Sequence, residues 1–287
     1  MKFIKANSIA VGLLSFVAVA HTHAQTNPYA KGPAPTSAAL EADGPFTVST
    51  QNISGSGFGG ATVYSPDTAG TYAVVAFCPG FTATRSSVAS FGRRLATHGF
   101  VVATIDTNST LDLPQSRGTQ LLAALKTVSA LSTGPAAGKI DAARKVVSGW
   151  SMGGGGTLYA SASDTTLKTA VGLAPYSAQK KKFSTSVPQL ILGGENDIVA
   201  PVSSHSLSFF NELPNATPKL YAEIADADHY FPTDAATSQP ASKLQIAWVK
   251  RFADNDTRYE QFLSTAGIQV DLTNGRLSDS RRESTTF

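Results

Sequence analysis

Residues 146–158 read VVSGWSMGGGGTL, and five glycines lie within eight residues around one serine, Ser151. The stretch follows an apolar run at 143–150 that is typical of a buried strand, and it opens a helical pattern at 153–163. Its centre, GWSMG, matches G-x-S-x-G, in which a sharp strand-to-helix turn exposes the serine oxygen above the sheet edge. Glycines are needed there because a Cβ would collide with the strand or the helix. The stretch therefore predicts a nucleophilic serine in an α/β sheet, the alternative being a glycine-rich helix start that serves close packing.

Apolar, β-rich runs alternate with helical patterns along the chain. Strands are predicted at 62–66, 72–80, 100–108, 143–150, 167–175, 187–197 and 218–226, and helices at 87–99, 115–131, 153–163 and 241–254. This alternation favours the α/β class, with a mostly parallel sheet covered by helices on both faces. Residues 55–60, GSGFGG, match the dinucleotide-binding pattern G-x-G-x-x-G, but a strand and not a helix follows them. They are therefore predicted to form a hairpin turn.

The first residues have the features of a secretory signal. Two lysines precede an apolar run at 8–20 that is too short to span a bilayer, and a small-x-small cleavage pattern follows it. We predict a signal peptide at 1–24 and one domain at 25–287. The protein is then expected to be secreted to the extracellular space, with passage through a periplasm left open.

Charge and cysteine content exclude several classes of partner. The formal charge of the 287 residues is +3, and removing the two lysines of 1–24, which carries no acid, leaves +1. A nearly neutral surface gives no reason to expect nucleic acid as a partner. No stretch after residue 24 is apolar enough for a membrane span. Cys78 is the only cysteine, so an intramolecular disulfide is excluded. We expect a monomer.

A serine hydroxyl needs a base to become a nucleophile. In this kind of fold the chain order is serine, then an acid, then histidine. His229 follows the strand at 218–226 in the loop ADADHYFP, and such loops at the carboxyl edge of a sheet build active sites. We predict His229 as the base. His205 is expected on the surface of a helix, and His98 precedes the serine at the end of a helix.

The acid should also follow a strand. Asp197 does so in QLILGGENDIVAP, where it would hold the imidazole tautomer and stabilise the imidazolium. Glu195 is the second candidate. Asp226 and Asp228 are weaker ones because they flank His229 in the same loop.

Two backbone N–H groups are predicted to form an oxyanion hole. Met152 lies at the start of a helix, where backbone donors are unpaired and the dipole is positive. Phe81 follows the strand at 72–80 and a Pro-Gly turn, which is where the second donor of this fold is found. The alternative for Phe81 is a plain Pro-Gly turn without function.

Several motifs together resemble one known family. They are GWSMGGGG at 149–156, PGFTAT at 79–84, ATHGFVVATIDTNSTLD at 96–112, GENDIVAPV at 194–202 and WVKRFADNDTRYEQFL at 248–263. The chain is similar, over about 27–263, to the bacterial cutinase-like polyesterases, which include the poly(ethylene terephthalate) hydrolases. The resemblance implies an α/β-hydrolase fold without a lid domain, an open groove, and serine-dependent hydrolysis of aliphatic and aromatic polyesters.

The resemblance also implies roles for individual residues. The family's nucleophile, acid and base fall on Ser151, Asp197 and His229, which agrees with the choice made from the residues. Its oxyanion donors fall on Phe81 and Met152. Phe81 and Tyr176 are the implied substrate contacts, with Tyr176 where the family usually carries a tryptophan that clamps the substrate ring. The alternative for Tyr176 is a half-buried core aromatic.

This chain departs from the family at several positions. Ser264 and the C-terminal residues STTF stand where relatives carry a disulfide, and Gly194 and Phe231 stand where some relatives carry a second one. Ala225 replaces an acid of calcium-binding relatives, so no metal is predicted, and the mechanism needs no cofactor. Three consecutive lysines at 180–182 are expected either on a solvated face or as an attraction for acidic polymer ends.

The predicted function is a secreted serine hydrolase that acts on carboxylic esters in polyesters of the cutin or poly(ethylene terephthalate) type. The alternative within the enzyme class is a lipase or small-ester esterase with the same triad. The alternative outside the enzyme class is a binding module without activity. The complete set of serine, aspartate and histidine argues against it.

Overall fold

The computed structural model describes residues 27–179 and 183–283. The predicted signal peptide and the lysines at 180–182 lie outside the described residues. Within these ranges the strands are β1 (Val48–Ile53), β2 (Gly60–Pro66), β3 (Tyr72–Cys78), β4 (Val101–Asp106), β5 (Ile140–Trp150), β6 (Thr169–Leu173), β7 (Gln189–Gly194), β8 (Lys219–Ile224) and β9 (Leu277–Glu283). The helices are α1 (Ser37–Leu40), α2 (Ala89–Thr97), α3 (Pro114–Ser129), α4 (Met152–Ser163), α5 (Ser206–Glu212), α6 (Gln239–Ala253), α7 (Glu260–Leu263) and α8 (Thr265–Thr273). Short 3-10 turns lie at Arg85–Val88, Phe231–Thr233 and Thr257–Tyr259.

The strands form one sheet, in the order β1-β2-β4-β3-β5-β6-β7-β8-β9 among the described residues. The central strands from β4 to β8 pair in parallel, whereas β1 and β2 at one edge and β9 at the other pair antiparallel. Parallel neighbours bring the carboxyl ends of β3, β5, β6, β7 and β8 to the same edge of the sheet. The loops that follow these strands therefore lie together, which is how the fold gathers a site.

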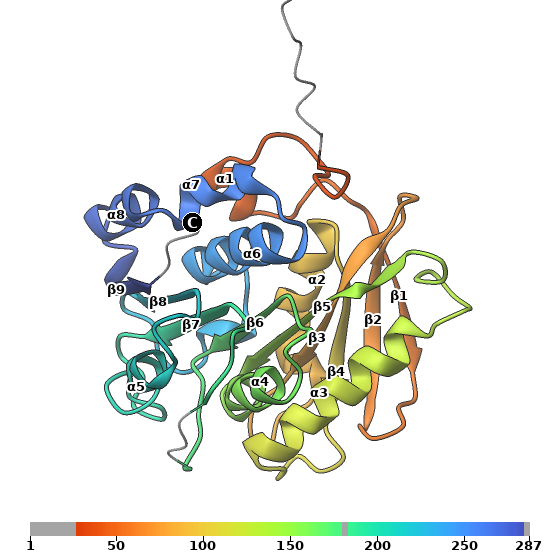
Figure 1. Cartoon of the computed structure of the whole chain (residues 1–287), viewed down its shortest axis with the longest axis horizontal. Coiled ribbons are helices and arrows are strands. Elements are labelled where there is room, and N and C mark those ends of the chain that lie inside the picture. The colour runs from red at the N-terminus through yellow and green to blue at the C-terminus, as the bar shows by residue number, and fades with distance from the viewer. Residues whose placement is uncertain (1–26, 180–182, 284–287) are drawn as a thin grey trace, which may run out of the picture.

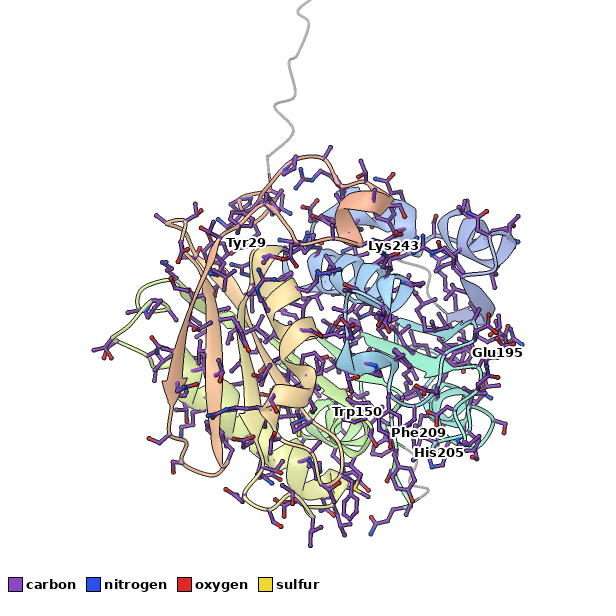
Figure 2. The ribbon with its side chains drawn as sticks, turned by 180° about the vertical axis from the view of Figure 1, so that it is seen from behind. Tyr29, Trp150, Glu195, His205, Phe209 and Lys243 are labelled. Atoms are coloured by element: carbon purple, nitrogen blue, oxygen red, sulfur yellow. The ribbon has the colours of Figure 1, made fainter. Side chains whose placement is uncertain are left out.

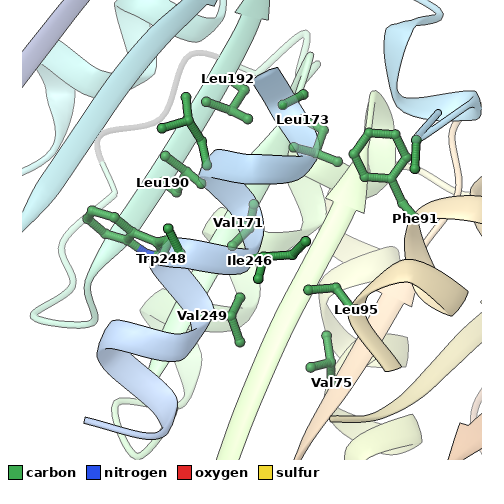
Figure 3. Close-up of a cluster of buried hydrophobic side chains, with 14 of the residues drawn as sticks. Val75, Phe91, Leu95, Val171, Leu173, Leu190, Leu192, Ile246, Trp248 and Val249 are labelled. Atoms are coloured by element: carbon green, nitrogen blue, oxygen red, sulfur yellow. The ribbon is translucent and has the colours of Figure 1, made fainter. Parts of the chain in front are cut away.

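Helices cover both faces of the sheet, as Figure 1 shows. Alternate residues of β3 face opposite layers. Val75 and Phe77 pack into the cluster that contains residues of α2 and α6, whereas Val74, Ala76 and Cys78 pack into the cluster that contains residues of α3. Figure 3 shows part of the first cluster, with Trp248 of α6 and Phe91 of α2 over the strands. Central strands buried on both faces explain their continuous apolar runs.

The α/β-hydrolase architecture predicted from the sequence is confirmed. Each predicted strand and helix has a counterpart, and 55–60 connects the antiparallel strands β1 and β2 as the predicted hairpin turn. The sequence did not predict β9, whose residues LSDSRRE are mostly polar. It forms because its backbone pairs with the open edge of β8. In the described ranges no inserted lid domain stands over the carboxyl edge of the sheet.

Two residues discussed above, Ser264 and Cys78, each have a defined place in the fold. Ser264 caps α8 by accepting a hydrogen bond from the N–H of Gly267 at 3.1 Å. Cys78 is a free, buried thiol in β3. None of the helices in the described ranges combines the length and the apolar character that crossing a bilayer requires.

Candidate active site

Ser151 occupies a strained turn between β5 and α4. Its φ and ψ are 55° and −121°, a conformation that costs about 1–3 kcal/mol for a residue other than glycine. A Cβ on Gly149 would lie 2.2 Å from the Gly153 carbonyl oxygen, and one on Gly153 would lie 2.3 Å from that of Cys78. Only glycine fits these positions. The glycines that follow also serve close packing, since a Cβ on Gly155 would lie 2.1 Å from the Tyr176 carbonyl oxygen. The glycines therefore serve both the tight turn at Ser151 and close packing of the helix start.

Three side chains predicted from the sequence lie in one hydrogen-bonded chain. The Oγ of Ser151 lies 2.9 Å from Nε2 of His229, and Nδ1 of His229 lies 2.7 Å from Oδ2 of Asp197. All three residues are buried. They come from the ends of β5, β7 and β8, so the parallel register brings together residues that are up to 78 positions apart. This arrangement can remove a proton from the serine hydroxyl.

The environment of Asp197 keeps it ionised. Burial alone would raise the pKa of this carboxyl, but hydrogen bonds from His229 and from the N–H groups of Ala200 and Val199 lower it further than burial raises it. The net pKa lies below the usual value of an aspartate. Asp197 can therefore hold the imidazole with Nδ1 protonated and Nε2 free to accept a proton.

Two backbone donors lie at the turn that presents Ser151. Met152 is the first residue of α4, and Phe81 follows the turn after β3. Among the described residues neither N–H donates a hydrogen bond within the protein. A Cβ on Gly80 would lie 3.1 Å from the Cβ of Ser151, so the backbone beside Phe81 passes directly over the serine. This proximity favours an oxyanion-binding role for the turn over a plain connection.

The other candidates from the sequence take different places. Glu195 accepts a hydrogen bond from the N–H of Asp226 through its carboxylate, and Asp228 accepts one from the N–H of Tyr230. His98 is buried at the end of α2 with Nε2 3.1 Å from the Ala42 carbonyl oxygen. The side chains of the four candidates take no part in the chain of hydrogen bonds at Ser151. These candidates are Glu195, Asp226, Asp228 and His98. In the described part of the sequence no group of three histidine, cysteine or acidic residues is arranged to hold a metal.

Tyr176 lies against the nucleophile turn. Its backbone N–H donates to the Ser151 carbonyl oxygen at 2.8 Å, and its half-buried ring stacks on His205, with centroids 4.8 Å apart and planes at 20°. The sequence placed His205 on a helix surface, and the structure places it directly before α5, half-buried against Tyr176. Figure 2 shows His205 beside Phe209, whose ring it meets edge-on. Nothing in the sequence pattern indicated this aromatic contact.

Apolar side chains lie exposed on the loops around the site. They follow β3, β4, β7 and β8, and we call them the apolar rim: Phe81, Leu111, Leu113, Ile198, Val199 and Tyr230. Ile198 and Val199 come directly after Asp197, and Tyr230 comes directly after His229. A pocket of about 180 Å³ beside Met152 and Tyr176 is lined in part by Leu113. Exposed apolar side chains that gather around a site indicate an apolar binding partner.

Two residues near the site were missed at the sequence level. The indole N–H of Trp150 donates to the backbone carbonyl of His229 at 2.9 Å. Arg117 of α3 is fully buried and donates to the Pro79 carbonyl oxygen, in the turn before Phe81. Trp150 stands within the G-x-S-x-G pattern, but nothing in the pattern indicates a partner so distant in sequence. Arg117 belongs to no motif and could only be found from the fold.

Comparison with known proteins gives consistent matches. A family model described as PET hydrolase-like matches residues 23–284. A cutinase of Thermobifida fusca (strain YX) is 46% identical over 258 residues, which cover 88% of this chain and 85% of the relative. Cutinase 1 of Thermobifida cellulosilytica is 47% identical over 241 residues, covering 83% and 91%. A bis(hydroxyethyl) terephthalate hydrolase of Streptomyces coelicolor is 47% identical over 246 residues, covering 84% and 78%.

Proposed function

The chain belongs to the PET hydrolase-like family, and on this premise we propose that it is a secreted carboxylic ester hydrolase that cleaves polyesters by serine acyl transfer. The family resemblance drawn from the sequence is thereby confirmed. The observation that carries the mechanism is the hydrogen-bonded chain from Ser151 through His229 to Asp197. It lies beside two unpaired N–H groups and within the apolar rim.

The first half of the reaction forms an acyl-enzyme. The Oγ of Ser151 attacks the ester carbonyl carbon while Nε2 of His229 accepts the hydroxyl proton. Asp197 accepts the hydrogen bond from Nδ1 and stabilises the imidazolium that forms. The carbonyl oxygen becomes an oxyanion and accepts hydrogen bonds from the N–H groups of Phe81 and Met152. Loss of one such donor typically lowers the rate by roughly 10²–10³-fold.

The second half releases the acid. The tetrahedral intermediate collapses when His229 returns its proton to the leaving alcohol, which leaves an ester on Ser151. His229 then removes a proton from water, and the resulting attack on the acyl-enzyme passes through a second oxyanion at the same two N–H groups. Collapse of this intermediate gives the carboxylic acid and restores the serine. In both halves of the reaction His229 accepts one proton and later returns it. No cofactor takes part.

Two features support a polymeric substrate over small esters alone. The apolar rim can contact a solid apolar surface while a chain segment reaches Ser151, and the described residues place no lid domain over this edge. Tyr176 provides an aromatic ring in the lining of the pocket beside Met152. The relative named a bis(hydroxyethyl) terephthalate hydrolase supports aromatic diesters among the substrates. A lipase or small-ester esterase with the same triad is the competing assignment.

Secretion is proposed from the sequence. A positively charged start, an apolar run at 8–20 and a small-x-small cleavage pattern are the features of an exported protein. Mass spectrometry of the protein recovered from the culture medium tests this directly. A mature N-terminus at Gln25 is expected, and retention of the whole chain inside the cell would contradict it.

The test of activity combines a soluble ester, tributyrin, cutin and an amorphous poly(ethylene terephthalate) film. We expect the protein to hydrolyse p-nitrophenyl butyrate and to release soluble aromatic acids from the film, and we expect Ser151→Ala to abolish both. Activity on soluble esters and tributyrin without release from film or cutin would favour the esterase or lipase assignment. Absence of any Ser151-dependent hydrolysis would favour a binding module.

A further inference from the structure

Arg117 is a fully buried cation behind the turn that carries Phe81. Its relative exposure is 0%, and its guanidinium donates to three backbone carbonyls of the surrounding loops. Nε donates to the Asp112 carbonyl oxygen at 2.7 Å, one terminal nitrogen to that of Pro79 at 3.1 Å, and the other to that of Thr110 at 2.8 Å. The Sγ of Cys78 lies 4.0 Å from the first terminal nitrogen.

No anion balances this cation at close range. In the part of the chain that the structure describes, no carboxylate forms an ion pair with Arg117. Asp112 offers its backbone carbonyl, while its carboxylate accepts hydrogen bonds from Ser109 and Gln120. Burial raises the pKa of the Cys78 thiol to about 12, so the thiol is neutral. Keeping an unpaired charge buried is expensive, and three carbonyl dipoles are what compensates it.

These hydrogen bonds hold the peptide units on both sides of the Phe81 N–H. Arg117 holds the carbonyl of Pro79 on one side. It also holds the carbonyl of Thr110, which accepts a second hydrogen bond from the N–H of Thr82 at 2.9 Å on the other side. Because peptide units are planar, fixing the units before and after Gly80–Phe81 restricts the unit between them, although glycine itself is permissive. That central unit carries the Phe81 N–H.

Packing against the nucleophile helix completes this arrangement. A Cβ on Gly153 would lie 2.4 Å from the Pro79 carbonyl oxygen, so the same carbonyl that Arg117 holds rests directly on α4. Pro79 is thus held between Arg117 of α3 and the first turn of α4. The relative position of the Phe81 and Met152 N–H groups therefore depends on the Pro79 peptide unit, which contacts both Arg117 and α4.

We propose that Arg117 is a positioning residue of the oxyanion hole, which fixes the Phe81 N–H relative to Ser151 and Met152 and places a buried positive charge behind the developing oxyanion. The inference rests on the proposed serine mechanism. It predicts a specific kinetic signature, because an oxyanion exists in the transition state and not in the bound ester. Loss of Arg117 should lower kcat with little change in KM.

The experiment compares Arg117→Gln and Arg117→Lys with the wild-type protein and with Arg144→Gln. Arg144 is a matched control because it is also a buried arginine, which donates to the Thr71 carbonyl oxygen and to Asp254, and it takes no part in the site. Active sites are counted by titration with a p-nitrophenyl phosphonate, so kcat is expressed per competent site. Inhibition by an aryl trifluoromethyl ketone, whose adduct carries an oxyanion, is measured beside inhibition by the product acid.

For Arg117→Gln we expect kcat per titrated site to fall roughly 10- to 100-fold, somewhat less than the loss of a whole oxyanion donor. Affinity for the trifluoromethyl ketone should fall in parallel, while affinity for the product acid stays the same. Arg117→Lys keeps the charge but cannot reach three carbonyls, so its kcat should lie between that of the wild-type protein and that of Arg117→Gln. Arg144→Gln should lose stability and keep its kcat per site.

Each other outcome overturns the inference. If either Arg117 variant folds and has the same kcat per titrated site as the wild type, the arginine only connects the loops and does not position the oxyanion hole. Equal loss of affinity for ketone and product acid would mean a general disturbance of binding. Absence of a cooperative thermal unfolding transition in both variants would assign Arg117 to folding alone. If the wild-type protein itself has no Ser151-dependent activity, the proposed function fails instead, and the two failures are distinct.

Discussion

The indole N–H of Trp150 donates a hydrogen bond to the backbone carbonyl of His229 at 2.9 Å. Trp150, which directly precedes the proposed nucleophile Ser151, therefore holds the backbone of the proposed base. The indole is buried, and its ring lies 5.8 Å from the imidazole between centroids. This bond fixes the backbone of the loop that carries His229, so it controls how well Nε2 is aligned with the Oγ of Ser151.

Trp150→Phe tests this alignment, because it keeps an aromatic ring and removes the donor. We expect kcat to fall about tenfold, equivalent to about 1.4 kcal/mol, because the His229 carbonyl loses a buried partner and the loop relaxes. Trp248→Phe is the matched control, since its indole N–H donates to Thr169 Oγ1 at 2.6 Å in the core away from the site. Both variants should melt at lower temperature, but only Trp150→Phe should change kcat. Equal kcat values in the two variants would argue against the alignment role.

Tyr176 should matter more for polymer than for a small ester. Its ring lines the pocket beside Met152, and contacts between aromatic rings contribute about 0.5–1.5 kcal/mol beyond the area buried. We expect Tyr176→Ala to lower release of aromatic acids from poly(ethylene terephthalate) film by roughly tenfold, with a smaller effect on p-nitrophenyl butyrate. Tyr176→Trp enlarges the face and should raise film hydrolysis. Equal effects of Tyr176→Ala on both substrates would make the residue a packing aromatic.

The apolar rim should bind the solid substrate. Ile198 is 90% exposed and contributes apolar area that only an external surface can cover. Burial of an isoleucine side chain is worth about 1.5–3 kcal/mol, so Ile198→Ser should weaken adsorption to polyester film by roughly 10- to 100-fold. Its kcat on soluble esters and its melting temperature should not change.

Val270 provides the control for this measurement. It is 57% exposed on α8, which is not one of the elements that carry the rim. Val270→Ser removes a comparable exposed side chain and should leave adsorption unaltered. If the two variants adsorb equally well, adsorption does not depend on the apolar rim.

The parts of the site that local sterics or strand order dictate could be predicted from the sequence. The turn at Ser151 is such a part, because a Cβ on Gly149 would collide with the Gly153 carbonyl oxygen only four residues along the chain. Asp197 and His229 are another, because residues that follow parallel strands reach the same sheet edge. The strand β9 could not be predicted, since its polar residues have no strand pattern and pair only because β8 offers an open edge.

Contacts between distant residues were beyond the reach of the sequence. Trp150 and His229 are 79 positions apart, and Arg117 and Pro79 are 38 apart. In each pair a side chain meets a backbone carbonyl, and any residue can supply a backbone carbonyl. No residue pattern therefore marks the partner, although the fold brings the two groups into contact.

His98 should make the protein less stable in mild acid. Burial lowers the pKa of this imidazole from 6.5 to about 4, against the smaller effect of its hydrogen bond to Ala42. The folded protein thus holds His98 neutral, while the unfolded chain binds a proton below pH 6.5. Its contribution to stability is complete above that pH and is lost progressively as the pH falls toward about 4. From about pH 7.5 to about pH 5 the loss amounts to about 2 kcal/mol.

Urea unfolding of the wild-type protein and of His98→Gln at these two pH values isolates this contribution. The glutamine amide can still donate to the Ala42 carbonyl but does not titrate, so the variant should lose about 2 kcal/mol less on acidification than the wild type. The charged neighbours Asp43, Arg94 and Lys250 are the same in both proteins, so their effects cancel in the comparison. His98 takes no part in the hydrogen-bonded chain of Ser151, His229 and Asp197, and kcat at neutral pH should not change. Parallel stability curves for the two proteins would show that His98 is protonated without cost in the folded state.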